Sequence, residues 1–201
     1  MDTRLALCDT RGPLTDLLDK LSGEDGEQWL RGLNKFLRKE DPWEMKEFLV
    51  WRTLTIGGVP KDELQTRLGD GFFVSDWAED VMSKPEFITA LEPYEIHLAR
   101  VKVKDLGFKE EPTITELFAR IREVGDLCPA EVGPHLRIAD KDQPKSTWYW
   151  VAMDPVTASG GDPDVFSVRR SGGGRRWLDA GGADPGRHWD LEDEVVFCLR
   201  K

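Results

Sequence analysis

The sequence has no long apolar run: no stretch of its 201 residues approaches the roughly 18 consecutive apolar residues that a membrane-spanning helix needs. The opening segment, MDTRLALCDTRGPLTDLLDK, places Asp and Arg among its few apolar residues. It therefore lacks the uninterrupted apolar core of a signal peptide. We expect a cytoplasmic protein with no membrane partner.

Cysteine and histidine are scarce, with three of each: Cys8, Cys128, Cys198, His97, His135 and His188. Three widely spaced cysteines argue against a disulfide framework and suit a reducing compartment. No CxxC, HxH or HExxH spacing occurs, so we expect no structural zinc site and no cofactor. A metal site assembled from distant residues stays open.

Catalytic and nucleotide-binding signatures are absent as well. The glycine-rich run SGGG at 171–174 lacks the GxxxxGK[ST] pattern and has no βαβ unit around it, which excludes the P-loop and Rossmann folds. No GxSxG nucleophile turn occurs. Without a coherent catalytic set, the sequence indicates a protein that is not an enzyme.

Acidic residues are abundant: 38 Asp and Glu face 28 Lys and Arg, a formal net charge of −10. An acidic chain repels nucleic acid at long range. Nucleic acid is therefore a disfavoured partner, and another protein is the expected one.

Tryptophan is frequent, with eight residues: Trp29, Trp43, Trp51, Trp77, Trp148, Trp150, Trp177 and Trp189. One interpretation is a core built from large aromatic side chains, with each indole N–H satisfied at the core edge. The other is an exposed aromatic face for a sugar, a base or a peptide.

The first 42 residues are predicted to form a helical arm or hairpin. Residues 1–12 read as a loose arm, and Pro13 opens a leucine stripe at helical spacing. A second amphipathic helix follows over 22–40, with an acidic start and a basic end that suit the helix dipole. The pair could pack on the rest of the chain or form a separate docking element.

Residues 43–201 are predicted to form an α+β domain, helix-rich to about 138 and β-rich over 146–201. It could also be continuous with the helical arm. The C-terminal strands suggest an antiparallel meander or a small barrel. Expected helices cover 61–68, 74–83 and 113–124, and expected strands cover 48–56, 94–103, 147–153, 165–169, 176–178 and 194–200.

The segment GDLCPAEVGPHLR at 125–137 holds Cys128, Glu131, His135 and Arg137 close together. Two prolines and two glycines predict a compact, rigid connection after the helix that ends at Gly125. The alternative pairs Cys128 with His135 as nucleophile and base. No recognisable signature surrounds the cysteine, so we favour the structural interpretation.

Four arginines surround a glycine-rich turn near a tryptophan, and these residues form the predicted binding site: Arg169, Arg170, Arg175, Arg176 and Trp177. Arginine forks suit phosphate or carboxylate, and an indole can stack on a base or a sugar. The alternative is a solvated hairpin tip whose arginines pair with the protein's own carboxylates.

Carboxylates also gather in the C-terminal loops: Asp154, Asp162, Asp164, Asp184, Asp190, Glu192 and Asp193. Paired carboxylates could act as acid and base in a hydrolase, or hold a cation. Asp is also an ordinary turn residue, which is the interpretation we favour.

The runs VSDWAEDVMSKP, VKVKDLGF, LCPAEVGPHLR, WYWVAMDPV and VVFCLRK together resemble a group of small bacterial proteins of uncharacterised role. The resemblance covers roughly residues 15–201, implies a bacterial intracellular protein, and transfers neither an activity nor a functional residue. Our leading hypothesis is a non-enzymatic protein-binding or accessory protein. The alternatives are a ligand- or nucleic-acid-binding module using the arginine hairpin, and a hydrolase using the loop carboxylates.

Overall fold

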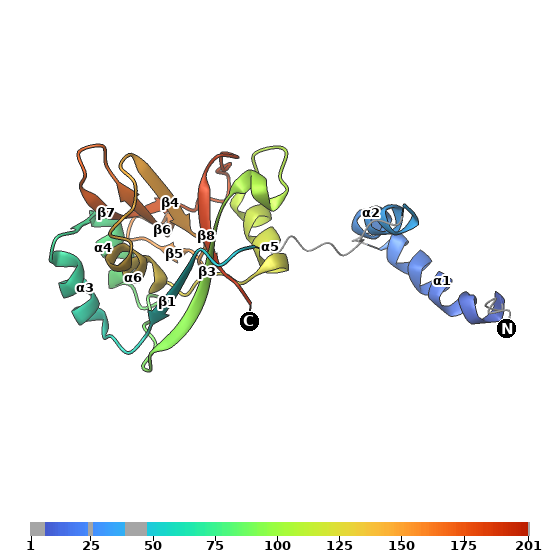
Figure 1. Cartoon of the computed structure of the whole chain (residues 1–201), viewed down its shortest axis with the longest axis horizontal. Helices are drawn as coiled ribbons and strands as arrows, with labels where there is room; N and C mark the ends of the chain where they lie inside the picture. The colour runs from blue at the N-terminus through green and yellow to red at the C-terminus, as the bar shows by residue number, and fades with distance from the viewer. Residues whose placement is uncertain (1–6, 24–25, 39–47, 201) are drawn as a thin grey trace. The chain divides into compact units, whose positions relative to one another are not determined.

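The computed structural model describes residues 7–23, 26–38 and 48–200 (Figure 1). The chain divides into two compact units, Met1–Lys46 and Glu47–Lys201, which we describe separately. The domain boundary expected after residue 42 lies outside the described residues. Within these residues, no helix is long and apolar enough to cross a membrane.

The smaller unit is a pair of helices, α1 (Leu7–Ser22) and α2 (Gly26–Leu37). The Lys20 ammonium lies 4.4 Å from the centre of the Trp29 ring and so links the two helices. The expected helix start at Pro13 is wrong, because α1 begins at Leu7 and contains Pro13. The expectation depended on the leucine stripe, which begins only at Leu14.

The helices of the larger unit include three that the sequence predicted, and local capping chemistry explains two of them. Ser75 caps α4 by accepting a hydrogen bond of 3.2 Å from the Ala78 N–H. Thr113 and Glu116 form both hydrogen bonds of a capping box at the start of α5. The helices are α3 (Lys61–Gly69), α4 (Asp76–Ser83), the 3-10 turn η1 (Val103–Leu106), α5 (Ile114–Val124) and α6 (Val132–Ala139).

Helix α6 corrects the prediction that 125–137 is only a connecting segment. The helix begins at Val132, immediately after a turn, and carries Pro134 in its first turn. Proline is tolerated there because the first backbone N–H groups of a helix have no intrahelical acceptor. Gly133 is required by packing, since a Cβ at this position would lie 2.6 Å from the Phe166 ring.

The strands of the larger unit form one mixed sheet, and the α+β class is confirmed. The order is β1-β3-β8-β4-β6-β7-β2, with β5 paired to β6. The C-terminal strands thus extend a sheet begun by β1 and β3, and β4 runs parallel to β8. The strands are β1 (Arg52–Ile56), β2 (Phe73–Val74), β3 (Tyr94–Lys102), β4 (Thr147–Val151), β5 (Val156–Thr157), β6 (Pro163–Arg170), β7 (Arg176–Gly182) and β8 (Glu194–Cys198).

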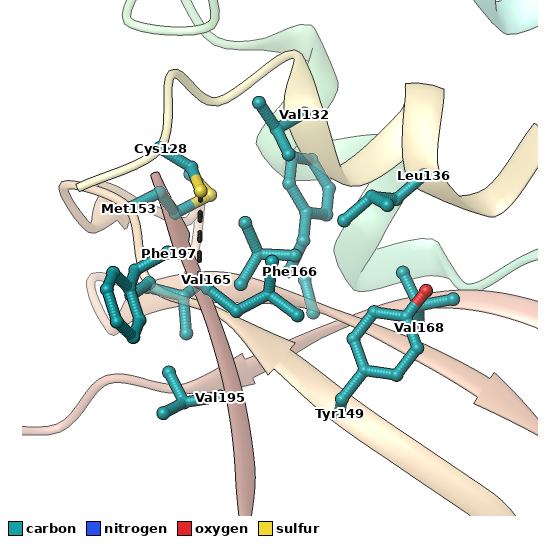
Figure 2. Close-up of a cluster of buried hydrophobic side chains, with 14 of the residues drawn as sticks. Cys128, Val132, Leu136, Tyr149, Met153, Val165, Phe166, Val168, Val195 and Phe197 are labelled. Carbon is teal, nitrogen blue, oxygen red and sulfur yellow. Dashed lines mark hydrogen bonds between the residues drawn. The ribbon is translucent and has the colours of Figure 1, made fainter. Parts of the chain in front are cut away.

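One face of the sheet, which we call the helix-covered face, packs against α6. Tyr149 and Val168 lie opposite each other on β4 and β6, and both are fully buried on this face. Figure 2 shows Val132 and Leu136 of α6 beside Phe166 and Val168 in this core. Burial of these side chains is the main source of the unit's stability.

The opposite face, which we call the outer face, is covered near β8 by the end of α5. Gly125 ends that helix, as expected, with an extended backbone at φ −168°. A Cβ at Gly125 would lie 2.5 Å from the Cys198 carbonyl and 2.7 Å from the Phe197 ring. Glycine is therefore needed here for close approach.

Strand β3 carries no bulge along its pairing with its neighbours. Its pairing with β8 is continuous through Leu98 and Ala99. Both residues are fully buried, because this part of the sheet is covered on both faces.

Candidate functional site

A row of four side chains crosses the outer face at one register. Trp148 on β4 lies opposite Arg169 on β6, Arg169 lies opposite Trp177 on β7, and Trp177 lies opposite Phe73 on β2. Residues at one register of a sheet point to the same face. The row therefore consists of an aromatic, a cationic and two aromatic groups, each one strand spacing of about 4.8 Å from the next.

The row is open to solvent at both ends: Trp148 is 48% exposed and Phe73 is 43% exposed. Arg175, in the β6–β7 turn, reaches the Phe73 end of the row, with its guanidinium carbon 5.2 Å from the centre of the Phe73 ring. We call these five residues, Phe73, Trp148, Arg169, Arg175 and Trp177, the Arg–Trp surface.

The arginines predicted as one site lie on two faces of the sheet. Arg169 and Trp177 share the outer face, and Arg175 joins them from the turn. Arg170 and Arg176 lie opposite each other one register along, so they point to the helix-covered face. There the Arg170 Nη1 donates a hydrogen bond of 2.7 Å to the Gln143 carbonyl.

The arginines of the Arg–Trp surface do not pair with carboxylates in the part of the chain that the structure describes. Other arginines of the larger unit do: Arg52 pairs with Asp140 at 2.9 Å, and Arg122 with Asp154 at 3.0 Å. The alternative of a hairpin tip neutralised by the protein's own acids is therefore not seen for Arg169 and Arg175. Their guanidinium donors are available to an anion.

The aromatic members of the surface hold these cations in place. Phe73 and Trp177 stack with ring centres 5.0 Å apart. The Arg169 guanidinium carbon lies 5.8 Å from the Trp177 ring centre, within the range of a cation–π contact. Each guanidinium therefore rests on a ring and keeps its hydrogen-bond donors for a ligand.

A surface hollow of about 480 Å³ lies beside Arg169. Its volume falls within the usual range of about 300–1,000 Å³ for small-molecule sites. The wall combines an exposed indole, a guanidinium, hydroxyls and one carboxylate, Asp179, whose Oδ1 accepts only from the neighbouring Ala180 N–H among the described residues. The lining residues are Ser146, Trp148, Trp150, Ser167, Arg169, Arg170, Ser171, Gly172 and Asp179.

A buried arginine supports the site from below. Arg137 on α6 is fully buried, and its Nη1 donates to the Gln143 side chain at 2.7 Å and to the Arg169 carbonyl at 3.2 Å. Its charge also faces Arg170 and Arg176 across the helix-covered side, and burial lowers its pKa. Arg137 therefore fixes the backbone of Arg169 without reaching the outer face.

Behind the hollow, Trp150 packs edge to face against the buried Trp189, with ring centres 5.2 Å apart. Arg187 lies over both rings, 5.0 Å from Trp150. Burial raises the pKa of Asp193, while Arg187 and the Trp148 indole favour its charged form. This layer holds the Trp148 end of the surface in position.

The segment 125–137 distributes its reactive residues among separate partners. The Cys128 sulfur lies 3.7 Å from Cys198 and 3.8 Å from the Val196 carbonyl, and burial raises the pKa of this thiol well above its usual value. His135 faces Glu131, with Nε2 3.6 Å from the carboxylate. The alternative catalytic pair of Cys128 and His135 is not among the hydrogen bonds and ion pairs of either residue in the described part of the chain.

Glu131 is a buried structural link. Its two carboxylate oxygens accept hydrogen bonds of 3.1 Å from the Gly57 and Ala90 N–H groups. Gly57 has a left-handed backbone, with φ +78°, which glycine adopts without a steric cost. The polar residues of 125–137 therefore serve the fold.

Several of the loop carboxylates have separate partners, whereas Asp164 is buried, and its burial and the nearby Asp162 carboxylate raise its pKa. Asp154 pairs with Arg122, Glu192 lies between Lys102 and Lys104, and Asp190 accepts from the Glu192 N–H at 2.8 Å. In the residues that the structure describes, no group of three or more His, Cys, Asp or Glu could hold a metal ion.

A second hollow, of about 600 Å³, lies between α3 and α4. Asp76, Glu79 and Asp80 line it, but Asp80 is bound by Ser159 and Lys84. It offers no cation and no exposed ring in its lining. The Arg–Trp surface is therefore the better-equipped site.

The tryptophans divide between the two expected roles. Trp189 is core, and Trp29, Trp51, Trp150 and Trp177 are half-buried. Trp77 and Trp148 are exposed, and Trp43 lies outside the described residues. Trp148 is the exposed indole of the Arg–Trp surface, and the sequence analysis did not assign it to a site.

Comparison with known proteins gives no further guide: no family model matches the chain, and no curated protein or solved structure matches it.

Proposed function

We propose that the chain is a binding protein whose Arg–Trp surface holds a small ligand carrying both an anionic group and a flat ring or sugar face. The observation that carries this proposal is the Trp148–Arg169–Trp177 row, in which an exposed, unpaired guanidinium stands between two indoles. Arginine on an aromatic face is preorganised for a forked hydrogen bond to phosphate or carboxylate.

The chemistry of the row explains why both parts of the ligand are needed. An exposed guanidinium alone binds a free anion weakly in water, because solvent screens the charge. An adjacent flat surface adds stacking and displaces water from the indole. A ligand with both parts gains both contributions at one strand spacing.

The test uses 1-naphthyl phosphate, a planar anion, with ¹H–¹⁵N spectra of the tryptophan indoles. Binding should shift the Trp148 and Trp177 signals first, and it should weaken as salt is raised. The double variant Arg169→Gln/Arg175→Gln should lose binding at least about tenfold, as expected for two charged hydrogen-bond donors. Arg122→Gln is the control, because it removes one positive charge from an exposed ion pair outside the Arg–Trp surface. This variant should bind 1-naphthyl phosphate as the wild type does.

An affinity for 1-naphthyl phosphate that neither the double substitution nor added salt lowers would overturn the proposal. So would binding that shifts only the indoles outside the Arg–Trp surface, because the probe would then occupy another place.

A second candidate function, capture of a protein partner by the N-terminal helices, has its own observation. Both helices of the smaller unit expose large apolar side chains, with Leu18 63% and Phe36 65% exposed. An amphipathic helix of this kind can bury such residues in the groove of another protein. The exposed set is Leu14, Leu18, Leu30, Phe36 and Leu37.

This candidate predicts that Leu18→Lys and Phe36→Lys each abolish co-purification of a partner with the tagged protein. Asn34→Lys, which adds the same charge at an exposed polar position of α2, is the control. A partner retained equally by all three variants would rule out these apolar residues as its docking surface.

A further inference from the structure

We infer that the ligand of the Arg–Trp surface is a nucleoside monophosphate, with its base on Trp148 and its phosphate on Arg169; this inference rests on the proposed function. It narrows that function from any planar anion to a ligand of three parts. Each part has its own group on the wall of the hollow.

The base has a stacking partner in Trp148. This indole lines the hollow and is about half exposed, whereas the Trp177 and Phe73 rings are stacked on each other and contacted by Arg169 and Arg175. Trp148 therefore offers the open ring face of the row. Indoles stack on all nucleobases, so this contact selects a base without choosing which one.

The phosphate has its partner one strand away. Arg169 lies directly opposite Trp148, at a spacing of about 4.8 Å between strands. In a nucleoside monophosphate, one sugar separates the base from the phosphate, so the two groups can reach neighbouring strands. Arg175 is a second cation of the surface, but it lies over Phe73 at the other end of the row and outside the lining of the hollow, so Arg169 is the cation that meets the phosphate.

The sugar and the base edge have polar partners within the same hollow. Asp179 and Ser167 form the next register of the outer face, directly beside Arg169 and Trp177. The Asp179 carboxylate accepts hydrogen bonds from hydroxyl or amino groups, and Ser171 at the turn supplies a hydroxyl. A simple aromatic anion leaves these groups unused, while a nucleotide can engage them.

The charge balance favours a single nucleotide over a nucleic-acid strand. A strand needs a line of cations that follows its phosphates, and the net charge of −10 opposes a polyanion. The Arg–Trp surface supplies only Arg169 and Arg175 as unpaired cations among its described residues. These two cations are enough for a single phosphate group but not for the phosphates of a strand.

The experiment compares adenosine 5′-monophosphate with its two halves, adenosine and ribose 5-phosphate, by quenching of tryptophan fluorescence and by calorimetry. The whole nucleotide should bind at least about tenfold more tightly than either half, since stacking and a charged hydrogen bond each contribute about that factor. A short single-stranded oligonucleotide should bind no more tightly, per site, than the mononucleotide.

Two variants assign the halves to residues. Arg169→Gln should weaken the nucleotide about tenfold and leave adenosine unchanged, whereas Trp148→Leu should weaken the nucleotide and adenosine but leave ribose 5-phosphate unchanged. Both residues are exposed, so both variants should fold, which urea unfolding checks.

The outcomes separate this inference from the proposed function. If 1-naphthyl phosphate binds at the surface but the nucleotide binds no better than ribose 5-phosphate, the nucleotide assignment is wrong and the proposed function stands. If neither binds, both are wrong. Tighter binding of the oligonucleotide, with a steep salt dependence, would replace the mononucleotide by a strand.

Discussion

Arg169 and Arg170 are neighbours in the chain, yet their side chains leave β6 on opposite faces of the sheet. Arg169 is exposed beside Trp177, whereas Arg170 is half-buried and donates a hydrogen bond of 2.7 Å to the Gln143 carbonyl. The first guanidinium is open to solvent, and the second holds the strand against the core.

Matched glutamine substitutions should therefore separate stability from binding. Arg170→Gln should lower the free energy of unfolding by about 1–2 kcal/mol, because a charged donor leaves a half-buried carbonyl. Arg169→Gln should change it by less than about 0.5 kcal/mol, as is usual at an exposed position. Urea unfolding measures both, and equal losses would contradict the assignment of these side chains to different faces.

The split of the arginines could have been predicted from the sequence. Side chains alternate along a strand, so adjacent arginines cannot share a face, and Trp148 and Trp150 must point away from Tyr149. The sequence analysis grouped the arginines by their distance along the chain instead. Phe73 had no such signal, because it belongs to a two-residue strand that pairs with β7 only in the folded chain.

The elements that sequence predicted best are those with local chemistry at their ends. Ser75 and the Thr113–Glu116 pair mark helix starts that depend only on neighbouring residues. Helix α6 was not predicted, because Gly133 and Pro134 are typical turn residues. Glycine is needed at position 133 because the ring of Phe166, 33 positions further along the chain, packs against it. Long-range packing of this kind leaves no local pattern.

Gly125 provides a test of close packing between α5 and β8. Gly125→Ala should lower the free energy of unfolding by about 2–3 kcal/mol, because the added Cβ meets the Cys198 carbonyl at 2.5 Å and the Phe197 ring at 2.7 Å. Gly69→Ala is the control, since a Cβ there would have nothing within 4 Å. If both variants unfold at the same urea concentration as the wild type, the close approach at Gly125 is not as described.

Asp80 should titrate at unusually low pH. The Ser159 hydroxyl and N–H each donate a hydrogen bond of 2.6 Å to its carboxylate, and with Lys84 they lower its pKa from 3.8 to about 2. Because the folded-state pKa lies below the unfolded value, this contact stabilises the fold above about pH 4. The contribution is lost as the pH falls from 4 towards 2.

Carboxyl ¹³C NMR measures this titration directly. Ser159→Ala should raise the pKa of Asp80, since the hydrogen bond from the Ser159 hydroxyl is the largest cause of the lowered pKa. Glu192, whose pKa Lys102 and Lys104 lower to about 2, should keep its midpoint in the same variant. An Asp80 midpoint that is ordinary in the wild type, or unmoved by Ser159→Ala, would contradict the contact.

Tyr149 should stabilise the larger unit through its hydroxyl as well as its ring. The ring is fully buried, and the hydroxyl donates a hydrogen bond of 3.0 Å to Asp140, whose other oxygen accepts from Arg52 at 2.9 Å. Tyr149→Phe keeps the ring and should lower the free energy of unfolding by about 1–2 kcal/mol, because a buried carboxylate loses a donor. Combining it with Arg52→Gln should cost more than the sum of the single changes, since Asp140 then loses both partners. Urea unfolding of the four proteins in this cycle gives the coupling energy, and strictly additive losses would show that Asp140 does not depend jointly on the two donors.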